Sequence, residues 1–100
     1  MKVPTVEILE TAPGKFAVRG DLTFATARRA REQGLQAFSA REGDMEVDCT
    51  GIGASDSAGL AVLLDWLAFA HRNGKTMRFT GVPPEIRAVA RISEVEDLLG

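Results

Sequence analysis

The residues best suited to chemistry occupy one stretch of the chain, residues 48–60, which reads DCTGIGASDSAGL. Its glycines permit backbone conformations and close approaches that larger residues prevent, and its hydroxyl and carboxylate oxygens can accept hydrogen bonds from the free amides of a helix start. Two enzymatic chemistries could arise here: phosphate binding by a glycine-rich loop, and nucleophilic attack by Ser57. Each of them requires a definite spacing of residues.

The glycine spacing does not fit a dinucleotide-binding loop. That fingerprint is G-x-G-x-x-G, whereas Gly51 and Gly53 are followed by Asp56 at the position of the third glycine. An aspartate there would repel a pyrophosphate. We therefore expect no nucleotide cofactor.

A hydrolase nucleophile is also disfavoured. The nucleophile elbow is G-x-S-x-G, and Ser55 stands where its first glycine belongs. The only histidine, His71, follows Ser57 by 14 residues on what we predict to be one helix, and a rise of about 1.5 Å per residue places it roughly 21 Å away. The chain is therefore not expected to be an enzyme, and no residue is given a catalytic role.

The composition is that of an ordinary globular domain. The chain has 100 residues, of which 45% are hydrophobic and 26% charged, and its formal net charge is −2. We therefore expect a single domain over residues 1–100 that has no electrostatic preference for nucleic acid or an anionic membrane. One cysteine, Cys49, and one histidine exclude an intramolecular disulfide and a zinc-type ligand cluster. The longest apolar run, residues 58–70, is too short to span a bilayer and contains Asp65.

The first residues of the chain do not resemble a secretory signal peptide. Together with the single cysteine, this favours a reducing, cytoplasmic location.

The first half of the chain predicts a hairpin followed by a helix. Residues 5–10 and 15–19 alternate as strands do, and Ala12-Pro13-Gly14 between them is typical of a turn. Thr23 can cap a helix over residues 24–40, in which Gly34 would allow a close approach to the sheet. The apolar or small residues that share the face turned to the sheet are Phe24, Ala27, Ala30, Gly34, Leu35 and Phe38.

The second half predicts alternating strands and helices. A short strand over residues 45–49 precedes a loop of small residues and a helix that opens at Ser57; a strand over 76–80 and a helix over 83–91 follow. Ser93 and Glu96 match a capping box for a last short helix carrying Val95, Leu98 and Leu99. The order β-β-α-β-α-β-α-α predicts an α/β fold: a mixed four-stranded sheet, with an opening antiparallel hairpin and then β-α-β units, packed with about four helices.

The helix that opens at Ser57 is apolar on more than one side. Its core sector contains Leu60, Leu63, Trp66, Leu67 and Ala70. The sector that should face solvent contains only small or apolar residues, namely Ala58, Ala61 and Ala68, with Val62 and Phe69 beside them. Either the domain buries this helix on both sides, or the sector is an interface with another protein.

Ser57 itself has two possible roles that its position allows. Its hydroxyl can cap the helix by accepting a hydrogen bond from an amide two or three residues on. A phosphate at the same position would add about −1.5 to −2 charges beside Asp56 and would oppose docking on an apolar surface.

The order of the predicted elements and several short motifs resemble those of a known family. The order of elements, with GDL at residues 20–22, VDC at 47–49 and above all DSAGL at 56–60, is similar to STAS domains over nearly the whole chain. This family contains anti-sigma-factor antagonists, the tails of sulfate transporters and the MlaB subunit of a phospholipid ABC transporter. In the antagonists the serine at the position of Ser57 is phosphorylated by the anti-sigma factor, so the resemblance implies that Ser57 is a phosphorylation site and switch.

Later segments are similar to MlaB-type subunits, namely LAVLL at residues 60–64, FTGVP at 79–83, AVAR at 88–91 and VEDLL at 95–99. Those subunits bind the cytoplasmic ATPase of the Mla (maintenance of lipid asymmetry) transporter. The resemblance implies a non-enzymatic cytoplasmic adaptor, held at the inner membrane by that ATPase, which supports phospholipid transport between membranes and outer-membrane lipid asymmetry. The alternative is an anti-sigma-factor antagonist whose partner kinase phosphorylates Ser57. The residues expected to bind the partner are Ser55, Asp56, Ser57, Ala58, Ala61, Val62 and Asp65.

Overall fold

The computed structural model describes residues 3–100. The elements follow one another as β1 (Val6–Ala12), β2 (Lys15–Leu22), α1 (Ala27–Ser39), β3 (Met45–Ser55), α2 (Ser57–Arg72), β4 (Met77–Thr80), α3 (Pro84–Ile92) and the short 3₁₀ helix η1 (Glu96–Leu99). This confirms the predicted order, with a 3₁₀ turn in place of a fourth α-helix.

The four strands form one mixed sheet in the order β1-β2-β3-β4. β1 and β2 are antiparallel and joined by a tight turn, in which Gly14 has φ +76°. β3 pairs in parallel with β2 on one side and with β4 on the other. The predicted α/β fold class is therefore confirmed.

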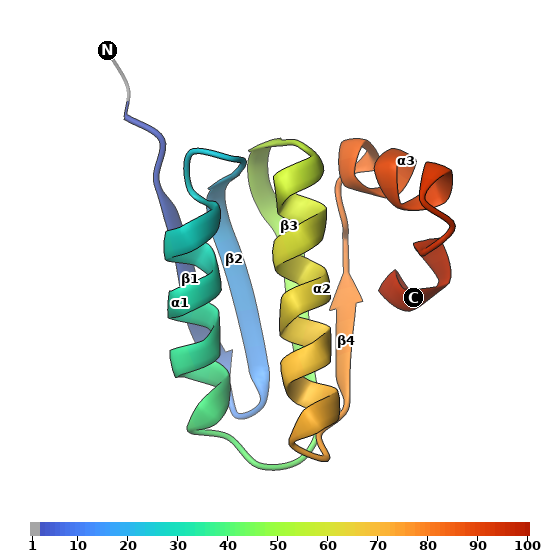
Figure 1. Cartoon of the computed structure of the whole chain (residues 1–100). Coiled ribbons are helices and arrows are strands. Elements are labelled where there is room, and N and C mark those ends of the chain that lie inside the picture. Colours follow the sequence, from blue (N-terminus) through green and yellow to red (C-terminus); the bar gives the residue numbers. More distant parts are fainter. Residues whose placement is uncertain (1–2) are drawn as a thin grey trace.

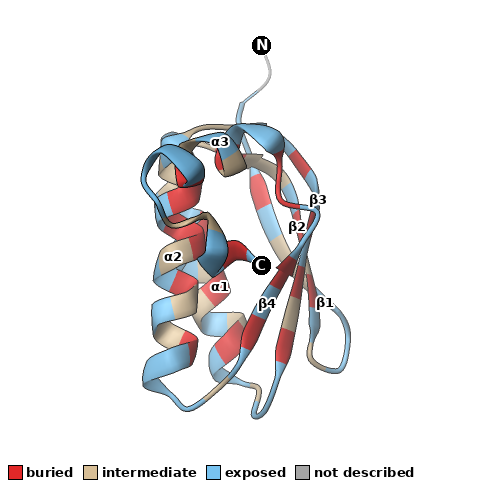
Figure 2. Ribbon diagram, turned by 90° about the vertical axis from the view of Figure 1, so that its right-hand side faces the viewer, coloured by how far each residue is buried: buried red, intermediate tan, exposed pale blue. Residues whose placement is uncertain are grey.

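The helices α1 and α2 lie side by side on one face of the sheet, and α3 with η1 lies beside β4 (Figure 1). Seen from the side, the sheet and the helices form two layers, with the buried residues between them (Figure 2). None of the helices in residues 3–100 has the length and apolar character needed to cross a membrane. Both α1 and α2 begin at the same end of the sheet (Figure 1).

Three aromatic rings form the centre of the core. Phe38 of α1 meets Phe16 of β2 edge to face at 5.0 Å between ring centroids, and meets Trp66 of α2 at 5.3 Å. The indole of Trp66 also explains Gly34, because a side chain at residue 34 would overlap this ring. The close approach that we expected at Gly34 is thus between two helices and not between a helix and the sheet.

Strand β3 is longer than predicted, because it continues from Cys49 to Ser55. The small residues that suggested a loop belong to the strand and pair with β2, with Gly51 opposite Arg19 and Ile52 opposite Gly20. An added Cβ at Gly51 would lie 2.7 Å from the carbonyl oxygen of Val18. Glycine is used here for close strand pairing, which a single sequence does not distinguish from loop flexibility.

Helix α1 begins three residues later than predicted, and this changes the position of Phe24. Residues 23–26 form a turn in which the buried Thr26 hydroxyl donates to the carbonyl oxygen of Asp21 (2.7 Å) and accepts from the amide of Thr23 (3.1 Å). Phe24 stands on this turn with 87% of its surface exposed. Its assignment to the core face is therefore wrong, whereas Ala30, Gly34 and Phe38 are buried as expected.

The predicted capping box near the end of the chain is not formed. Glu96 pairs with Arg91 (3.2 Å) instead of reaching back to Ser93, and η1 has no side-chain cap. Leu99 is buried, but Leu98 is 57% exposed and does not belong to the core. The Glu96 carboxylate, which the capping box would have required, is bound to Arg91 instead.

Candidate functional site

The start of α2 is capped by Asp56. Its backbone is extended (φ −149°, ψ −168°), and its Oδ1 accepts a hydrogen bond from the amide of Ala58 at 2.8 Å. Ser57 is the first residue of the helix and is exposed. The proposed capping role of Ser57 is therefore wrong, since a capping side chain must precede the helical backbone and Asp56 occupies that place. The hydroxyl group of Ser57 is presented to solvent.

The same aspartate binds a second segment of the chain. Its Oδ2 accepts a hydrogen bond from the amide of Phe24 at 3.1 Å, across 32 positions in sequence. Asp21 makes a similar link, because its Oδ1 accepts from the amide of Ala54 at 3.1 Å. These two carboxylates fasten the turn before α1 to the segment that leads into α2.

A shallow groove of about 360 Å³ separates the first turns of the two helices. The small or apolar residues of its lining are Phe24, Ala27, Ala58, Ala61 and Val62, and the charged ones are Arg28, Arg31 and Asp65. Arg31 and Asp65 bridge it with an ion pair at 3.1 Å between Nε and Oδ2. We call this surface the α1–α2 groove. Ser57 immediately precedes Ala58 of its lining.

The structure brings most of the predicted partner-binding residues together at the groove. Ala58, Ala61 and Asp65 line it, and Ala61 and Asp65 are exposed. Val62 also lines it but is only 3% exposed, so it contributes to the floor and to the domain's own core. Ser55 is half-buried, and its hydroxyl oxygen is shielded from solvent.

The exposed sector of α2 is not covered by the rest of the domain. Ala61, Asp65 and Ala68 are all exposed, so residues 3–100 do not bury this helix on both sides. Phe69 is half-buried, with the ammonium of Lys75 at 5.5 Å from its ring centroid. The alternative that the domain buries this sector is therefore wrong, and the interface with another protein stays a prediction.

The sequence did not indicate that Phe24 belongs to the groove. Helical periodicity placed this residue on the core face, whereas the turn at residues 23–26 points it outward. Thr23 and Thr26 could have indicated the turn, because threonine side chains compete for backbone hydrogen bonds and favour turns before a helix. The hydroxyl of Thr23 accepts from the amide of Ala25 at 3.2 Å.

His71 and Cys49 do not form a catalytic arrangement with Ser57. His71 is exposed in the last turn of α2, at the opposite end of the helix from Ser57. Cys49 is fully buried, and burial raises the pKa of its thiol to about 12, which keeps it protonated at neutral pH.

The fold is shared with solved structures of low sequence identity. The structure of the anti-sigma factor antagonist SpoIIAA in its unphosphorylated form matches with a TM-score of 0.71 and 14% identity, over 93% of this chain and 84% of that one. A sulfate transporter family protein from Wolinella succinogenes matches with a TM-score of 0.66 and 14% identity, over 94% and 76% of the two chains. The murine Solute Carrier 26 family member A9 anion transporter in its inward-facing state matches with a TM-score of 0.59 and 13% identity, over 88% of this chain and 14% of that one. Identities this low establish a common fold only.

The family is established by sequence. No curated protein matches the chain. A family model described as "Mlab, STAS domain" matches residues 9–100, which is nearly the whole chain, and the chain therefore belongs to the STAS domain family.

Proposed function

We propose that this chain is a non-enzymatic adaptor that binds the cytoplasmic ATPase subunit of an Mla-type phospholipid ABC transporter through the α1–α2 groove. STAS domains generally act as regulatory or protein-interaction modules, and the matching family model is of the Mlab type. In this role the chain supports transport of phospholipid between membranes and is held at the cytoplasmic side of the inner membrane by its partner.

The single observation that carries the proposal is the exposure of Phe24 beside the groove. A phenylalanine that is 87% exposed leaves a large apolar surface in water, and aromatic side chains of this kind are enriched at interfaces. The hydrogen bond from its amide to Asp56 keeps the backbone of Phe24 in place, so little ordering of the backbone is needed on binding. Phe24 therefore has the position and the rigidity of an anchor for a partner.

The rest of the groove complements that anchor. Ala58 and Ala61 leave room for side chains of a partner, and Val62 supplies an apolar floor. Arg28, Arg31 and Asp65 form a charged border. An apolar centre with a charged border is the usual anatomy of a specific protein interface.

Ser57 provides a means of regulating this contact. Its hydroxyl is exposed at the first residue of α2, where the positive end of the helix dipole tolerates a phosphate. The added charge would lie beside Asp56 and at the entrance to an apolar surface, so that the partner would have to desolvate it. Phosphorylation of Ser57 would therefore weaken docking.

A second candidate function is that of an anti-sigma-factor antagonist regulated by phosphorylation of Ser57. The observation in its favour is the match to SpoIIAA, which has the highest TM-score of the three structures above. In that case the groove would bind a kinase of the anti-sigma-factor type instead of a transporter ATPase.

The experiment is affinity purification from the native cell, with mass spectrometry of what co-elutes, for the wild-type chain and for Phe24→Ala. The matched control is Ile92→Ala, which removes a similar exposed apolar side chain (84% exposed) from α3, outside the groove. We expect the ATPase with the wild type and with Ile92→Ala, and its loss with Phe24→Ala. An anti-sigma factor in place of the ATPase would establish the second function. Retention of the ATPase by Phe24→Ala would refute the groove as its binding site.

A further inference from the structure

The strand β1 is at the edge of the sheet, and the face of the sheet beside it is covered by α1. Thr5 accepts a hydrogen bond from the amide of Asp21 (2.8 Å), so the odd-numbered residues here turn their backbone groups toward β2. Because strand residues alternate, the backbone groups of Val6, Ile8 and Glu10 point to the free side. A row of free backbone groups of this kind is a template for pairing with another strand.

Gln33 of α1 occupies the centre of this free side. Its Nε2 donates to the carbonyl oxygen of Val6, and its Oε1 accepts from the amide of Ile8, both at 3.3 Å. In a parallel ladder, a residue opposite Glu7 would make the same two bonds with its own backbone N–H and C=O. The side-chain amide of Gln33 thus takes the place of one residue of a neighbouring strand.

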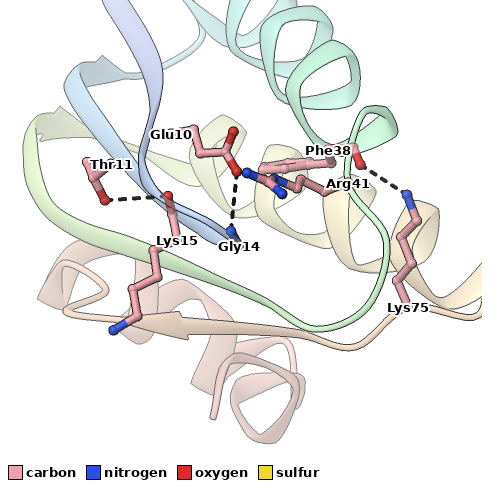
Figure 3. Close-up of polar contacts among 7 residues, drawn as sticks. All are labelled: Glu10, Thr11, Gly14, Lys15, Phe38, Arg41 and Lys75. Atoms are coloured by element: carbon pink, nitrogen blue, oxygen red, sulfur yellow. Dashed lines mark hydrogen bonds and ion pairs between the residues drawn. The ribbon is translucent and has the colours of Figure 1, made fainter.

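Side chains on either side of Gln33 also bind groups along this edge. One turn earlier on α1, the guanidinium of Arg29 donates to the carbonyl oxygen of Pro4 at 3.1 Å. Beyond the end of α1, Arg41 pairs with the carboxylate of Glu10, which also accepts from the amide of Gly14 at 3.2 Å (Figure 3). Only Gln33 pairs with both a backbone donor and a backbone acceptor of β1 in these contacts.

We propose that Gln33 closes the edge of β1 against strand addition, and that the strand it excludes is β1 of a second copy of this chain. This inference does not depend on the proposed function, because it concerns the opposite side of α1 from the groove.

The sequence of β1 shows why a second copy is the strand to be excluded. An antiparallel pair of β1 strands centred on Ile8 uses the free groups of both copies, and it places Ile8 opposite Ile8, Val6 opposite Glu10, and Glu7 opposite Leu9. No two carboxylates stand directly opposite each other in this register, which avoids the like-charge pairs that destabilise a ladder most directly. The two four-stranded sheets would join into one continuous sheet through identical surfaces, as a two-fold dimer requires.

The test compares Gln33→Leu with Gln36→Leu. Leucine is close to glutamine in size but makes neither hydrogen bond, so Gln33→Leu opens the edge. Gln36 is an exposed residue of the same helix, and its substitution adds the same apolar side chain without changing these bonds. By light scattering over a range of concentrations, we expect the mass of Gln33→Leu to rise to that of a dimer, and the wild type and Gln36→Leu to remain monomeric.

A second measurement tests the closure directly in the wild-type chain. Hydrogen exchange of the Ile8 amide should be slower than that of Glu10, whose amide also points to the free side. In Gln33→Leu, at concentrations where it is monomeric, exchange at Ile8 should be about tenfold faster, as loss of one hydrogen bond allows. A wild-type chain already paired through β1, a Gln33→Leu variant that stays monomeric, or unchanged exchange at Ile8 would each overturn the proposal.

Discussion

The carboxylate of Asp56 joins two structural features that the sequence places far apart. One oxygen caps α2 through the amide of Ala58 (2.8 Å), and the other accepts from the amide of Phe24 (3.1 Å). The start of the helix that presents Ser57 and the turn that presents Phe24 are thereby held by a single side chain.

Substitution of Asp56 should separate its two roles. Asp56→Ala removes both acceptors and should cost about 1–2 kcal/mol of stability, the upper range for loss of a helix cap. Asp56→Asn should cost less, because the one side-chain oxygen of asparagine caps a helix equally well, but its NH2 group then faces Phe24 and cannot accept from that amide. Urea unfolding measures the first effect, and hydrogen exchange at the Phe24 amide measures the second. An Asp56→Ala variant as stable as the wild type would show that the cap contributes nothing.

Ser57 should influence partner binding more than stability. Since its hydroxyl is not the cap, Ser57→Ala should change the free energy of unfolding by no more than about 0.5 kcal/mol. Ser57→Asp should be at least as stable as Ser57→Ala, because a carboxylate in the first turn interacts favourably with the helix dipole. The order of affinity for the ATPase should be the reverse, with Ala above Asp, because the partner must desolvate the added charge. Calorimetry and thermal unfolding on the same samples would reveal the opposite orders, and tighter binding by Ser57→Asp would indicate a basic pocket on the partner.

The groove prediction can be tested with two alanines of the same helix. Ala61→Glu and Ala68→Glu are both exposed and face nearly the same direction, since seven residues make about two turns, but only Ala61 lines the groove. Both variants should unfold within about 0.5 kcal/mol of the wild type. Affinity for the partner should fall at least about tenfold for Ala61→Glu, which buries a charge, and should be unchanged for Ala68→Glu. Equal losses for the two variants would place the interface along the whole helix instead of at the groove.

The buried thiol of Cys49 predicts a decline of stability in alkali. Burial raises the pKa of this thiol in the folded chain from its ordinary 9.0 to about 12. Below the lower value both states hold the proton; as the pH rises between the two values, the unfolded thiol ionises while the folded one does not, so the free energy of unfolding decreases. Urea unfolding at a series of pH values measures this slope. The Cys49→Ala variant, although less stable, should lack this part of the slope, and an identical slope in both chains would contradict the assignment.

Much of the fold was predictable from local patterns. The alternation around Phe16 and Val18 indicates a strand whose inner side is buried, and both residues are buried in β2. Pro84 occupies the first turn of α3, where its missing N–H costs nothing. The DSAGL motif marks the start of α2, and this was predictable because capping and turn chemistry involve residues only a few positions apart.

The candidate site was predictable only in part. The sequence alone indicated an exposed, weakly apolar sector on α2, together with the importance of Asp56 and Ser57. Which of the two caps the helix, how far β3 extends, and whether Phe24 lies inside or outside the core were decided by tertiary structure. The last two depend on partners distant in sequence: Gly51 pairs with Arg19 of β2, and Asp56 meets the amide of Phe24. Periodicity in one segment cannot specify such contacts, because it reports which side of an element is apolar and not which distant residue will pack or hydrogen-bond there.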